Sequence, residues 1–572
     1  MRSIRANHRI LFLLAVVVCV FAAALTRAVW LQVVDADVYK AMALKQHSER
    51  IVIPPTRGTI FDRTGEPLAI GERAITVVAD PKMVADPILV AKQAEALLGV
   101  DADSLYERLR DTSNRFTYVL RQADEGKALA FKELGLLGVN FYPEERRSYP
   151  QGRVASQVIG LVGVDNEGLE GLERALEAKL AGTPGFEDVI RDPGGRPIDV
   201  VRSKPEQPGT SVNLTIDHQI QSSAEAEVLE AMRRWQAKGA TAIVMDPRSG
   251  AILAMANAPT FNPNRVSDST VDARRNRAVT DIYEPGSTFK IVTIAAALEE
   301  GIVTPKTRFT LAPTIRVGSH TIREAHARPT QRMTVRDILS RSSNVGTITV
   351  GLKLGRGNVA AWVERFGFGR RTGIDYPGES AGMVLPLEQW SDSTLGTVPI
   401  GQGIAVTAIQ MASAYAAIGN GGVMAHPHLV ESIGGASGEP SAGRRVVSRK
   451  TAAQMMAMFT SAVMDGTGGE AAIPGYTVAG KTGTAQKPEK GGYATGKYVA
   501  SFVGLVPATK PRFVILVMVD EPRGEIYGGV VAAPVFRDIA RFVLQYLEVP
   551  PDAPETVDGS LVVAALAATA AE

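Results

Sequence analysis

The stretch Glu284-Pro-Gly-Ser-Thr-Phe-Lys290 places a serine three residues before a lysine, directly after a proline–glycine pair. The pair interrupts the chain, and the segment that follows, up to Leu298, is mostly apolar, so a buried helix is predicted to begin at Ser287. Lys290 then lies one turn along the same face of this helix. Because burial lowers the pKa of a lysine, Lys290 could act as a base towards the Ser287 hydroxyl. The stretch indicates a nucleophilic serine with its activating lysine.

A second motif, Ser342-Ser-Asn344, is predicted at or near a helix junction. A hydroxyl and a carboxamide two residues apart can both point into a cleft, where Ser342 could pass a proton and Asn344 could hold a peptide backbone. Taken alone, this tripeptide is better explained by ordinary helix capping. Taken alone, Ser-x-x-Lys also fits a capping serine followed by a surface lysine.

The third motif, Lys481-Thr-Gly-Thr484, lies in a predicted strand. Gly483 would let the backbone of a ligand approach closely, while the Lys481 ammonium and the hydroxyls of Thr482 and Thr484 would bind a carboxylate. A polar edge strand with a bulge is the alternative for this motif alone. The three motifs together, in this chain order, indicate a serine acyl-transfer enzyme.

Strands are expected on both sides of the motifs. Residues 240–245 and 251–256 predict a hairpin, residues 498–505 and 513–519 predict two more strands, and a last helix is predicted from Pro534 to about Leu547. The segment between, about 270–470, is predicted to be helical. The expected fold class is α+β: residues 212–547 form an antiparallel sheet flanked by helices, with an all-helical middle.

The N-terminal segment predicts a membrane anchor. The run from Ile10 to Leu25 carries no charge, and residues 10–31 approach the length of about 20 residues that crosses a bilayer. Arginines at positions 2, 5 and 9 precede it, so residues 1–9 are expected to be a cytoplasmic tail and the rest of the chain to be extracytoplasmic. A cleaved signal peptide is the alternative, since Ala22-Ala23-Ala24 could serve a peptidase.

The chain between anchor and motifs divides into further segments. Residues 32–50 predict a helical juxtamembrane stalk, and residues 51–205 predict an elongated β-rich pedestal or dimerisation-type module with helices over 86–138. Residues 205–209 resemble a linker. Residues 548–572, rich in proline and alanine, are expected to be disordered.

Composition excludes several classes of function. The 572 residues have a net charge of +2, which gives no support to a nucleic-acid partner. The one cysteine excludes an internal disulfide and a cysteine-based zinc site, and the seven histidines show no metal-binding spacing.

With all three motifs, the chain resembles a class B penicillin-binding protein, a family of peptidoglycan D,D-transpeptidases. The resemblance extends from the anchor to about residue 547. It rests also on motifs outside the predicted site: Arg57-Gly-x-x-x-Asp62-Arg63-x-Gly65-x-x-Leu68-Ala69, Arg147-x-Tyr149-Pro150-x-Gly152, Gly171-Leu-Glu173, Asp246-Pro-x-x-Gly250, Gly401-Gln-Gly403, Tyr498-x-x-Ser-Phe502-x-Gly504 and Gly528-Gly529-x-x-Ala532-Ala-Pro534.

The resemblance implies a chemistry and a role for each motif residue. Ser287, activated by Lys290, would attack the D-Ala-D-Ala carbonyl of a donor stem peptide, and the acyl-enzyme would pass to an amine on a neighbouring stem. Backbone N–H groups of Ser287 and Thr484 would form the oxyanion hole, and β-lactams would trap Ser287. No metal or cofactor is implied. The residues assigned to catalysis are Ser287, Lys290, Ser342 and Lys481, and those assigned to substrate binding are Asn344, Thr482, Gly483 and Thr484.

The resemblance favours the division-specific (FtsI-like) branch over the elongation branch, on the residues around Tyr493 to Pro507 and on Asp520-Glu-Pro522. Phe289 departs from this pattern, since many septal relatives have valine there. The implied partners are a SEDS-family (FtsW-like) glycan polymerase and other division proteins, which the pedestal would dock, at the inner membrane. The alternatives are a hydrolase on the same fold and a non-catalytic, membrane-anchored scaffold or sensor that only binds penicillin.

Overall fold

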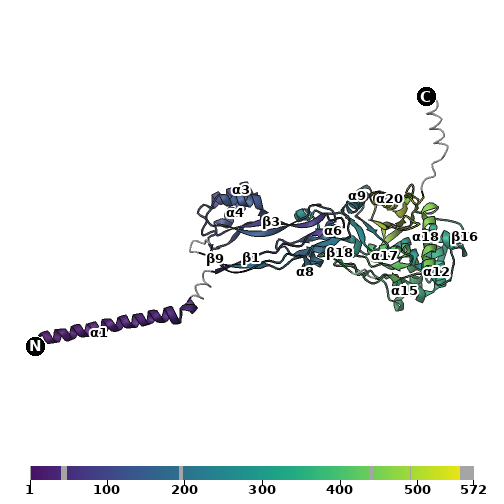
Figure 1. Ribbon diagram of the computed structural model, residues 1–572. Helices are drawn as coiled ribbons and strands as arrows, with labels where there is room; N and C mark the ends of the chain where they lie inside the picture. Colours follow the sequence, from purple (N-terminus) through teal and green to yellow (C-terminus); the bar gives the residue numbers. More distant parts are fainter. Residues whose placement is uncertain (1, 40–47, 192–196, 439–441, 490, 554–572) are drawn as a thin grey trace, which may run out of the picture.

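The computed structural model describes residues 2–39, 48–191, 197–438, 442–489 and 491–553. Within these ranges the molecule is elongated: helix α1 (Arg2–Val29) lies at one end, a β-rich pedestal follows, and a larger α+β domain lies at the other end (Figure 1). Residue 1 of the expected tail, residues 40–47 of the expected stalk and residues 554–572 of the expected disordered segment lie outside the described residues.

The N-terminal helix has the length and composition of a membrane span. Residues Asn7–Val34 form one continuous helical stretch of 28 residues, in which the most apolar window of 18 residues has a mean hydropathy of 2.6 and is not buried against the rest of the protein. Its last turns, Trp30–Val34, are π-helical. The helix is consistent with the predicted single-pass membrane anchor.

The pedestal is built from two antiparallel sheets. Strands β1 (Ser48–Ile53), β8 (Gly185–Arg191) and β9 (Pro197–Lys204) form the first. In the second, the long strand β3 (Pro67–Ala79) pairs with β4 (Thr117–Asp124) and β5 (Val139–Ser148). Helices α3 (Pro87–Leu98), α4 (Ala102–Leu109) and α5 (Glu125–Glu133) share a core with this sheet. The expectation of helices over 86–138 overlooked β4, whose Thr-Tyr-Val start favours a strand.

Short elements complete the pedestal, and a buried ionic network holds them together. They are α6 (Ser156–Ile159), β6 (Leu161–Val162), β7 (Gly168–Glu170), α7 (Gly171–Ala175) and α8 (Glu177–Leu180). The fully buried Glu173 carboxylate accepts hydrogen bonds from Arg57 Nε at 2.8 Å and Arg147 Nε at 2.7 Å. Three motif residues far apart in the sequence therefore meet in one place.

One sheet runs from the pedestal into the larger domain. Strand β2 (Ile60–Phe61) pairs with β3 on one side and, in parallel, with β10 (Val212–Leu214) on the other. Strand β10 then pairs with β18 (Val430–Ile433), which is followed by β19 (Ala436–Ser437). The segment that resembled a linker is also fixed to the pedestal, because Gly209 N donates to the Thr56 carbonyl at 2.8 Å.

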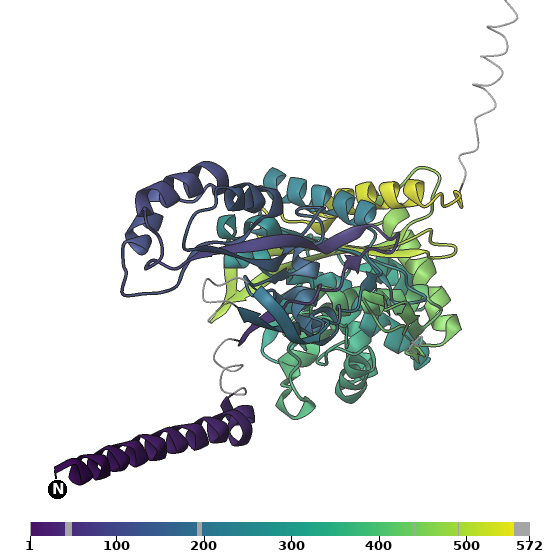
Figure 2. The same cartoon turned by 60° about the vertical axis from the view of Figure 1, so that its left-hand side comes forward.

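The larger domain has the predicted antiparallel sheet. Its order is β12 (Ile252–Ala258), β11 (Gly239–Met245), β23 (Phe513–Asp520), β22 (Gly492–Val506) and β21 (Ala479–Glu489). Helices α9 (His218–Arg234) and α20 (Ala533–Tyr546) lie side by side on one face, and the α17 (Ala408–Gly419) and α18 (Arg449–Met464) helices lie on the other (Figure 2). Asp217 caps α9 as expected.

The middle of this domain is not all-helical, so that part of the prediction is wrong. The helices there are α10 (Val271–Arg274), α11 (Arg277–Thr280), α12 (Lys290–Glu299), α13 (Val335–Ser340), α14 (Asn344–Leu354), α15 (Arg356–Arg365) and α16 (Asp392–Thr397). Short strand pairs interrupt them: β13 (Arg308–Leu311) with β16 (Gln331–Thr334), β14 (Thr314–Val317) with β15 (His320–Arg323), and β17 (Val423–Met424) with β20 (Arg444–Arg445). The pair β14–β15 alternates polar and apolar residues around Gly318-Ser319, which is a hairpin signal.

Candidate active site

The predicted nucleophile starts the helix, as the sequence indicated. Residues Gly286–Phe289 form a 3₁₀ turn that continues into α12. Gly286 has φ +54° and its N–H donates to the Gly401 carbonyl at 3.0 Å. A Cβ on Gly286 would lie 3.1 Å from the Thr484 carbonyl oxygen, so this close packing of β21 and the left-handed φ both favour a glycine.

A cleft of about 760 Å³ opens above this turn. Its lining includes five of the eight predicted site residues: Ser287, Ser342, Asn344, Thr482 and Thr484. The other three, Lys290, Lys481 and Gly483, are buried beneath it. The structure therefore gathers all three motifs, which span almost two hundred positions of sequence, around one cavity.

Lys290 is completely buried and hydrogen-bonded to the second motif. Its Nζ donates to the Ser342 carbonyl at 2.7 Å, to Asn344 Oδ1 at 2.8 Å and to Ser342 Oγ at 3.3 Å. Burial, and next the nearby Lys481 ammonium, hold the pKa of Lys290 well below its usual range, against an opposing effect of Glu324. Among the described residues the Ser287 hydroxyl has no hydrogen-bond partner, which leaves it free to turn towards Lys290 or a substrate.

The second motif is held in an uncommon conformation. Ser342 has φ +59°, a left-handed value that is rare for residues other than glycine. Ser343 then caps α14 by accepting from Gly346 N at 2.9 Å. The prediction that the tripeptide lies at a helix junction is confirmed. Ser343 caps α14, and all three residues of the tripeptide line the cleft.

Glu324 is a site residue that the sequence analysis missed. It follows β15, and its nearly buried carboxylate accepts hydrogen bonds from Ser343 Oγ at 2.6 Å and from Asn344 N at 2.7 Å. Arg328 pairs with the same carboxylate at 2.5 Å. Glu324 therefore fixes the turn that carries Ser342. No spacing in the sequence links it to the motifs, because a hairpin brings it there.

The third motif lies on β21, the edge strand of the sheet. Lys481 Nζ donates to the Thr482 carbonyl at 3.1 Å and to Thr482 Oγ1 at 3.3 Å. Thr482 Oγ1 lies 2.7 Å from Thr467 Oγ1, and Thr484 Oγ1 accepts from Gly528 N at 3.1 Å. Burial lowers the pKa of Lys481 to about 7.

The structure gives Gly483 a different reason from the one inferred from sequence. A Cβ at this position would lie 2.3 Å from Ser501 Oγ and 3.1 Å from the Pro285 carbonyl oxygen. Both atoms belong to the protein, so the glycine is required by the packing of β21 against β22 and against the segment that precedes Ser287. The close approach of a ligand to the backbone of Gly483 stays a prediction.

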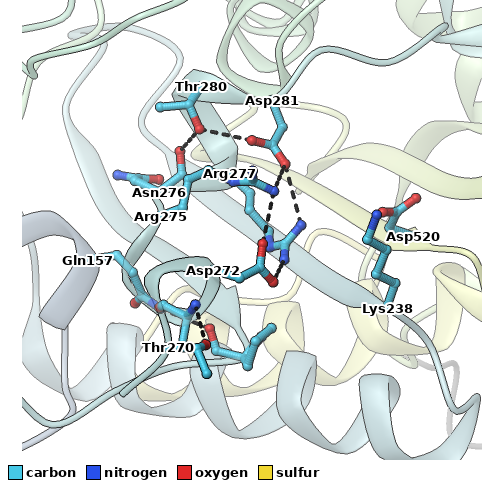
Figure 3. A network of polar contacts seen from close by, with 12 residues as sticks. Gln157, Lys238, Thr270, Asp272, Arg275, Asn276, Arg277, Thr280, Asp281 and Asp520 are labelled. Atoms are coloured by element: carbon cyan, nitrogen blue, oxygen red, sulfur yellow. Dashed lines mark hydrogen bonds and ion pairs between the residues drawn. The ribbon is translucent and has the colours of Figure 1, made fainter. Parts of the chain in front are cut away.

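A polar network anchors the segment that leads to Ser287 (Figure 3). The buried Arg277 pairs with Asp272 at 2.5 Å and with Asp281 at 3.4 Å. Gln157, from α6 of the pedestal, donates through Nε2 to the carbonyls of Ala273 and Pro259 at 2.8 and 3.0 Å. The pedestal thus contacts the segment that precedes the nucleophile in the sequence.

Glu284, three residues before Ser287, links two neighbouring loops. It is 8% exposed and accepts hydrogen bonds from Gly403 N at 2.9 Å and from the Tyr493 hydroxyl at 3.0 Å. Burial raises the pKa of Glu284, against the effect of these two donors. The carboxyl joins the β21–β22 hairpin to the loop at 401–403.

In the described residues, one group has the composition of a metal site. Asp62, Asp217 and His218 offer ligand atoms within 4.8 Å of one another at the junction of pedestal and domain. Asp62 already accepts from His218 Nδ1 at 2.6 Å and from Thr64 N at 2.7 Å, and Arg63 lies 3.6 Å from Asp217. A cation would have to displace these donors, so the geometry favours a hydrogen-bonded junction.

Comparisons with known proteins agree with this geometry. Residues 240–541 match the model of the penicillin binding protein transpeptidase domain, and residues 52–214 match that of the penicillin-binding protein dimerisation domain. The chain is 35% identical to the peptidoglycan D,D-transpeptidase FtsI of Escherichia coli, over 96% of this chain and 94% of that protein. It is 36% identical to the probable peptidoglycan D,D-transpeptidase PenA of Neisseria gonorrhoeae, over 97% and 95%.

Solved structures show the same fold. A peptidoglycan synthetase from Bifidobacterium adolescentis has a TM-score of 0.72 and 27% identity, covering 89% of this chain and 98% of that one. Penicillin binding protein 3 from Mycobacterium tuberculosis, complexed with aztreonam, has a TM-score of 0.68 and 31% identity, covering 88% and 98%. On the match to both family models and on identity over nearly its whole length, this chain belongs to the class B penicillin-binding proteins, the family of peptidoglycan D,D-transpeptidases.

Proposed function

We propose that the protein cross-links septal peptidoglycan by D,D-transpeptidation through an acyl-enzyme on Ser287. The observation that carries the proposal is the convergence of a free serine hydroxyl, a buried lysine with a lowered pKa and two hydroxyl-bearing motifs on one cleft. Each of these is a part that acyl transfer needs. Peptidoglycan stem peptides ending in D-Ala-D-Ala are the proposed substrate.

In the first half-reaction, Ser287 Oγ attacks the carbonyl carbon of the penultimate D-Ala as its proton passes to the neutral amine of Lys290. Its lowered pKa makes Lys290 available as that base near neutral pH. The C–N bond then breaks, and Ser342, hydrogen-bonded to Lys290 at 3.3 Å, relays the proton to the leaving D-Ala amine. An ester on Ser287 remains.

In the second half-reaction, an amine on a neighbouring stem attacks the ester carbonyl and gives up a proton to the neutral Lys290. The C–O bond then breaks, and a proton returns from Lys290 to the Ser287 oxygen. The backbone N–H groups of Ser287 and Thr484 are the proposed oxyanion hole, because the Gly286 turn and the Thr484 backbone are in close contact. No metal or cofactor enters either step.

The remaining motif residues would orient the donor peptide. Asn344 faces the cleft beside Lys290 and would hold the peptide backbone. Lys481 has a pKa of about 7 because it is buried without a carboxylate. A substrate carboxylate bound by Thr482 and Thr484 would raise the pKa of Lys481 again and restore its positive charge. Lys481 would therefore be charged, and able to pair with the donor carboxylate, only when the donor peptide is bound.

β-Lactams would acylate Ser287 in the same way as the donor. The complexes of Mycobacterium tuberculosis penicillin binding protein 3 with aztreonam and ampicillin support this for a relative of 31% identity. The support for the division-specific branch is likeness to FtsI and PenA over nearly the full chain. The elongation branch remains the alternative, and depletion of the protein distinguishes them: filaments are expected for a septal enzyme, rounded cells for an elongation enzyme.

The proposed setting is the inner membrane, with residues 1–9 cytoplasmic, residues 10–31 spanning the membrane and the rest extracytoplasmic. The arginines before the helix support this orientation. We further propose that residues 51–205 act as a pedestal that docks a SEDS-family, FtsW-like polymerase and other division proteins. Deletion of residues 57–200 should then abolish co-purification of the polymerase.

The first test of the activity is the intact mass of the full-length protein after incubation with benzylpenicillin. A stable adduct is expected on the wild type and on the control variant Ser461→Ala. In the wild type the Ser461 hydroxyl donates to the Ala457 carbonyl. No adduct is expected on Ser287→Ala. Consumption of the drug without an adduct would identify a hydrolase, and intact drug without an adduct would identify a scaffold.

A further inference from the structure

A second cavity, of about 500 Å³, lies elsewhere in the larger domain and shares no lining residue with the active-site cleft. It is bordered by the end of α15, the loop that follows, α17 and the β17–β20 pair. Four arginines contribute to its lining: Arg365, Arg370, Arg371 and Arg444. All four side chains are exposed, so the cavity presents solvent-accessible guanidinium groups.

The described residues supply only part of the counter-charge for these arginines. Of the four arginines, Arg370 pairs with Glu364, and no ion pair with a described carboxylate is formed by the others. Arg444 instead donates to the Arg365 carbonyl at 2.6 Å, and the Arg365 guanidinium lies 4.6 Å from the ring of Trp362. Burial, and next repulsion by Arg365 and Arg370, lower the pKa of Arg444.

A buried carboxylate beside the cavity is already occupied. Glu379, behind the cavity wall, accepts hydrogen bonds from the N–H and hydroxyl of Thr372, both at 2.6 Å, and from Gly373 N at 3.1 Å. Glu299 also interacts electrostatically with Arg365, so one positive charge remains when the Glu299, Glu364 and Glu379 charges are all counted. The cavity is therefore electropositive.

A buried hydroxyl without a partner also belongs to this cavity. Ser413, on α17, is 3% exposed and lines it, and its Oγ has no hydrogen-bond partner in the described part of the protein. A buried hydroxyl is costly when it stays unpaired. One turn earlier, Gln410 donates to the carbonyls of Arg370 and Ala381 at 2.7 and 2.9 Å, so the backbone of the arginine loop is fixed against the same helix.

We propose that this cavity binds a small, multiply charged oxyanion with the size and charge of a diphosphate or a tricarboxylate. Guanidinium groups match phosphate and carboxylate oxygens with paired hydrogen bonds, which suits Arg365, Arg371 and Arg444. The unpaired Ser413 hydroxyl would donate to the ligand, and Phe366 and Met424 among the lining residues restrict the ligand to a compact shape. The binding is independent of acyl transfer at Ser287.

The test is isothermal titration calorimetry of the full-length protein in detergent, with pyrophosphate and with citrate as separate probes. Sodium chloride keeps the ionic strength equal in all titrations, because surface charge effects are screened by salt. The variants are Arg365→Gln/Arg444→Gln and Ser413→Ala. The matched control is Arg336→Gln/Arg541→Gln, which removes the same charge at two exposed positions outside the cavity.

Saturable binding of at least one probe is expected for the wild type and the control. The double arginine variant should weaken it at least roughly tenfold, and Ser413→Ala roughly threefold. The probe that binds with the higher affinity shows whether the site prefers phosphate or carboxylate groups. Acylation by benzylpenicillin should stay unchanged in every variant, which shows that they fold and separates this outcome from any failure of the proposed function.

The proposal is overturned if neither probe binds at millimolar concentration. It is also overturned if the control weakens binding as much as the double variant, because the effect would then come from net charge alone. If Arg365→Gln/Arg444→Gln fails to fold, Ser413→Ala decides: unchanged affinity in that variant contradicts the proposal.

Discussion

Replacing Glu324 by glutamine should separate two effects of this carboxylate on the active site. One of its oxygens accepts from Ser343 Oγ and Arg328, and the other accepts from Asn344 N. Glutamine has nearly the same shape but keeps one acceptor oxygen, and its amide nitrogen would face a donor. At least one of these hydrogen bonds is lost, and the turn that carries Ser342 is loosened.

The expected size of this effect follows from the type of bond. A hydrogen bond to a charged group contributes about 1.5–3 kcal/mol, and about 1.4 kcal/mol corresponds to tenfold in rate. If the turn must be formed for Ser342 to relay its proton, acylation of Ser287 in Glu324→Gln should slow by roughly tenfold to a hundredfold at its optimum pH.

The second effect is on the pKa of Lys290. Burial and the Lys481 ammonium lower that pKa, and the Glu324 carboxylate opposes them. Removal of the carboxylate therefore lowers the pKa of Lys290 further. Because the neutral amine is the base, the acidic limb of the profile of acylation rate against pH should move to lower pH. The plateau of this profile, which is the maximal rate, should fall.

The assay is the second-order rate of labelling by a fluorescent penicillin, measured from mildly acidic to alkaline pH. Arg328→Gln is the matched control: it removes a partner of Glu324 but keeps the carboxylate, so its acidic limb should stay closer to that of the wild type. An acidic limb that is unmoved or moves to higher pH in Glu324→Gln would refute the electrostatic reasoning. An unchanged plateau would refute the positioning role.

The other predictions concern packing and buried charge. Glu173→Gln should lower the free energy of unfolding by about 3 kcal/mol or more, because two buried arginines lose their shared counter-charge. Chemical denaturation measures this free energy, and a decrease below about 1 kcal/mol would contradict the reasoning. Gly483→Ala should cost about 1–3 kcal/mol by overpacking and slow acylation, and the second substitution Ser501→Gly should restore part of both, since it removes the 2.3 Å contact. Tyr493→Phe should lower the free energy of unfolding by about 1 kcal/mol at neutral pH, because the variant lacks the hydrogen bond that stabilises the charged Glu284 carboxylate. This difference in stability should shrink as the pH falls through the raised pKa of Glu284. A difference that does not change with pH would exclude Glu284 as the partner that matters.

The sequence allowed the nucleophile, its lysine and the two other motifs to be predicted because each depends on local order. Ser287 and Lys290 are one helical turn apart, so their proximity follows from helix geometry alone. The strands around the motifs were also predictable, since each is a mostly apolar run. The assignment of catalytic and binding roles stays a prediction, because geometry alone does not test it.

What could not be predicted depends on contacts between distant segments. Glu324 reaches the Ser342 turn because a hairpin carries it there, and no periodicity signals such a contact. The reason for Gly483 was inferred from its motif, whereas the atoms that exclude a side chain belong to Ser501 and Pro285. The pairing of β2 with β10 joins residues about 150 positions apart, which local propensity does not encode.

The sheet that runs through both parts of the molecule has a mechanical consequence. In the proposed setting, the protein is fixed to the membrane at one end and, as an acyl-enzyme, covalently joined to the cell wall at the other. Strand β3 of this sheet runs along the long axis between these ends, as do strands β1 and β9 of the pedestal's other sheet (Figure 1). Ladder hydrogen bonds are perpendicular to antiparallel strands, so tension along this axis shears many bonds at once instead of unzipping them singly. We therefore expect the pedestal to resist extension while the cell wall is under tension.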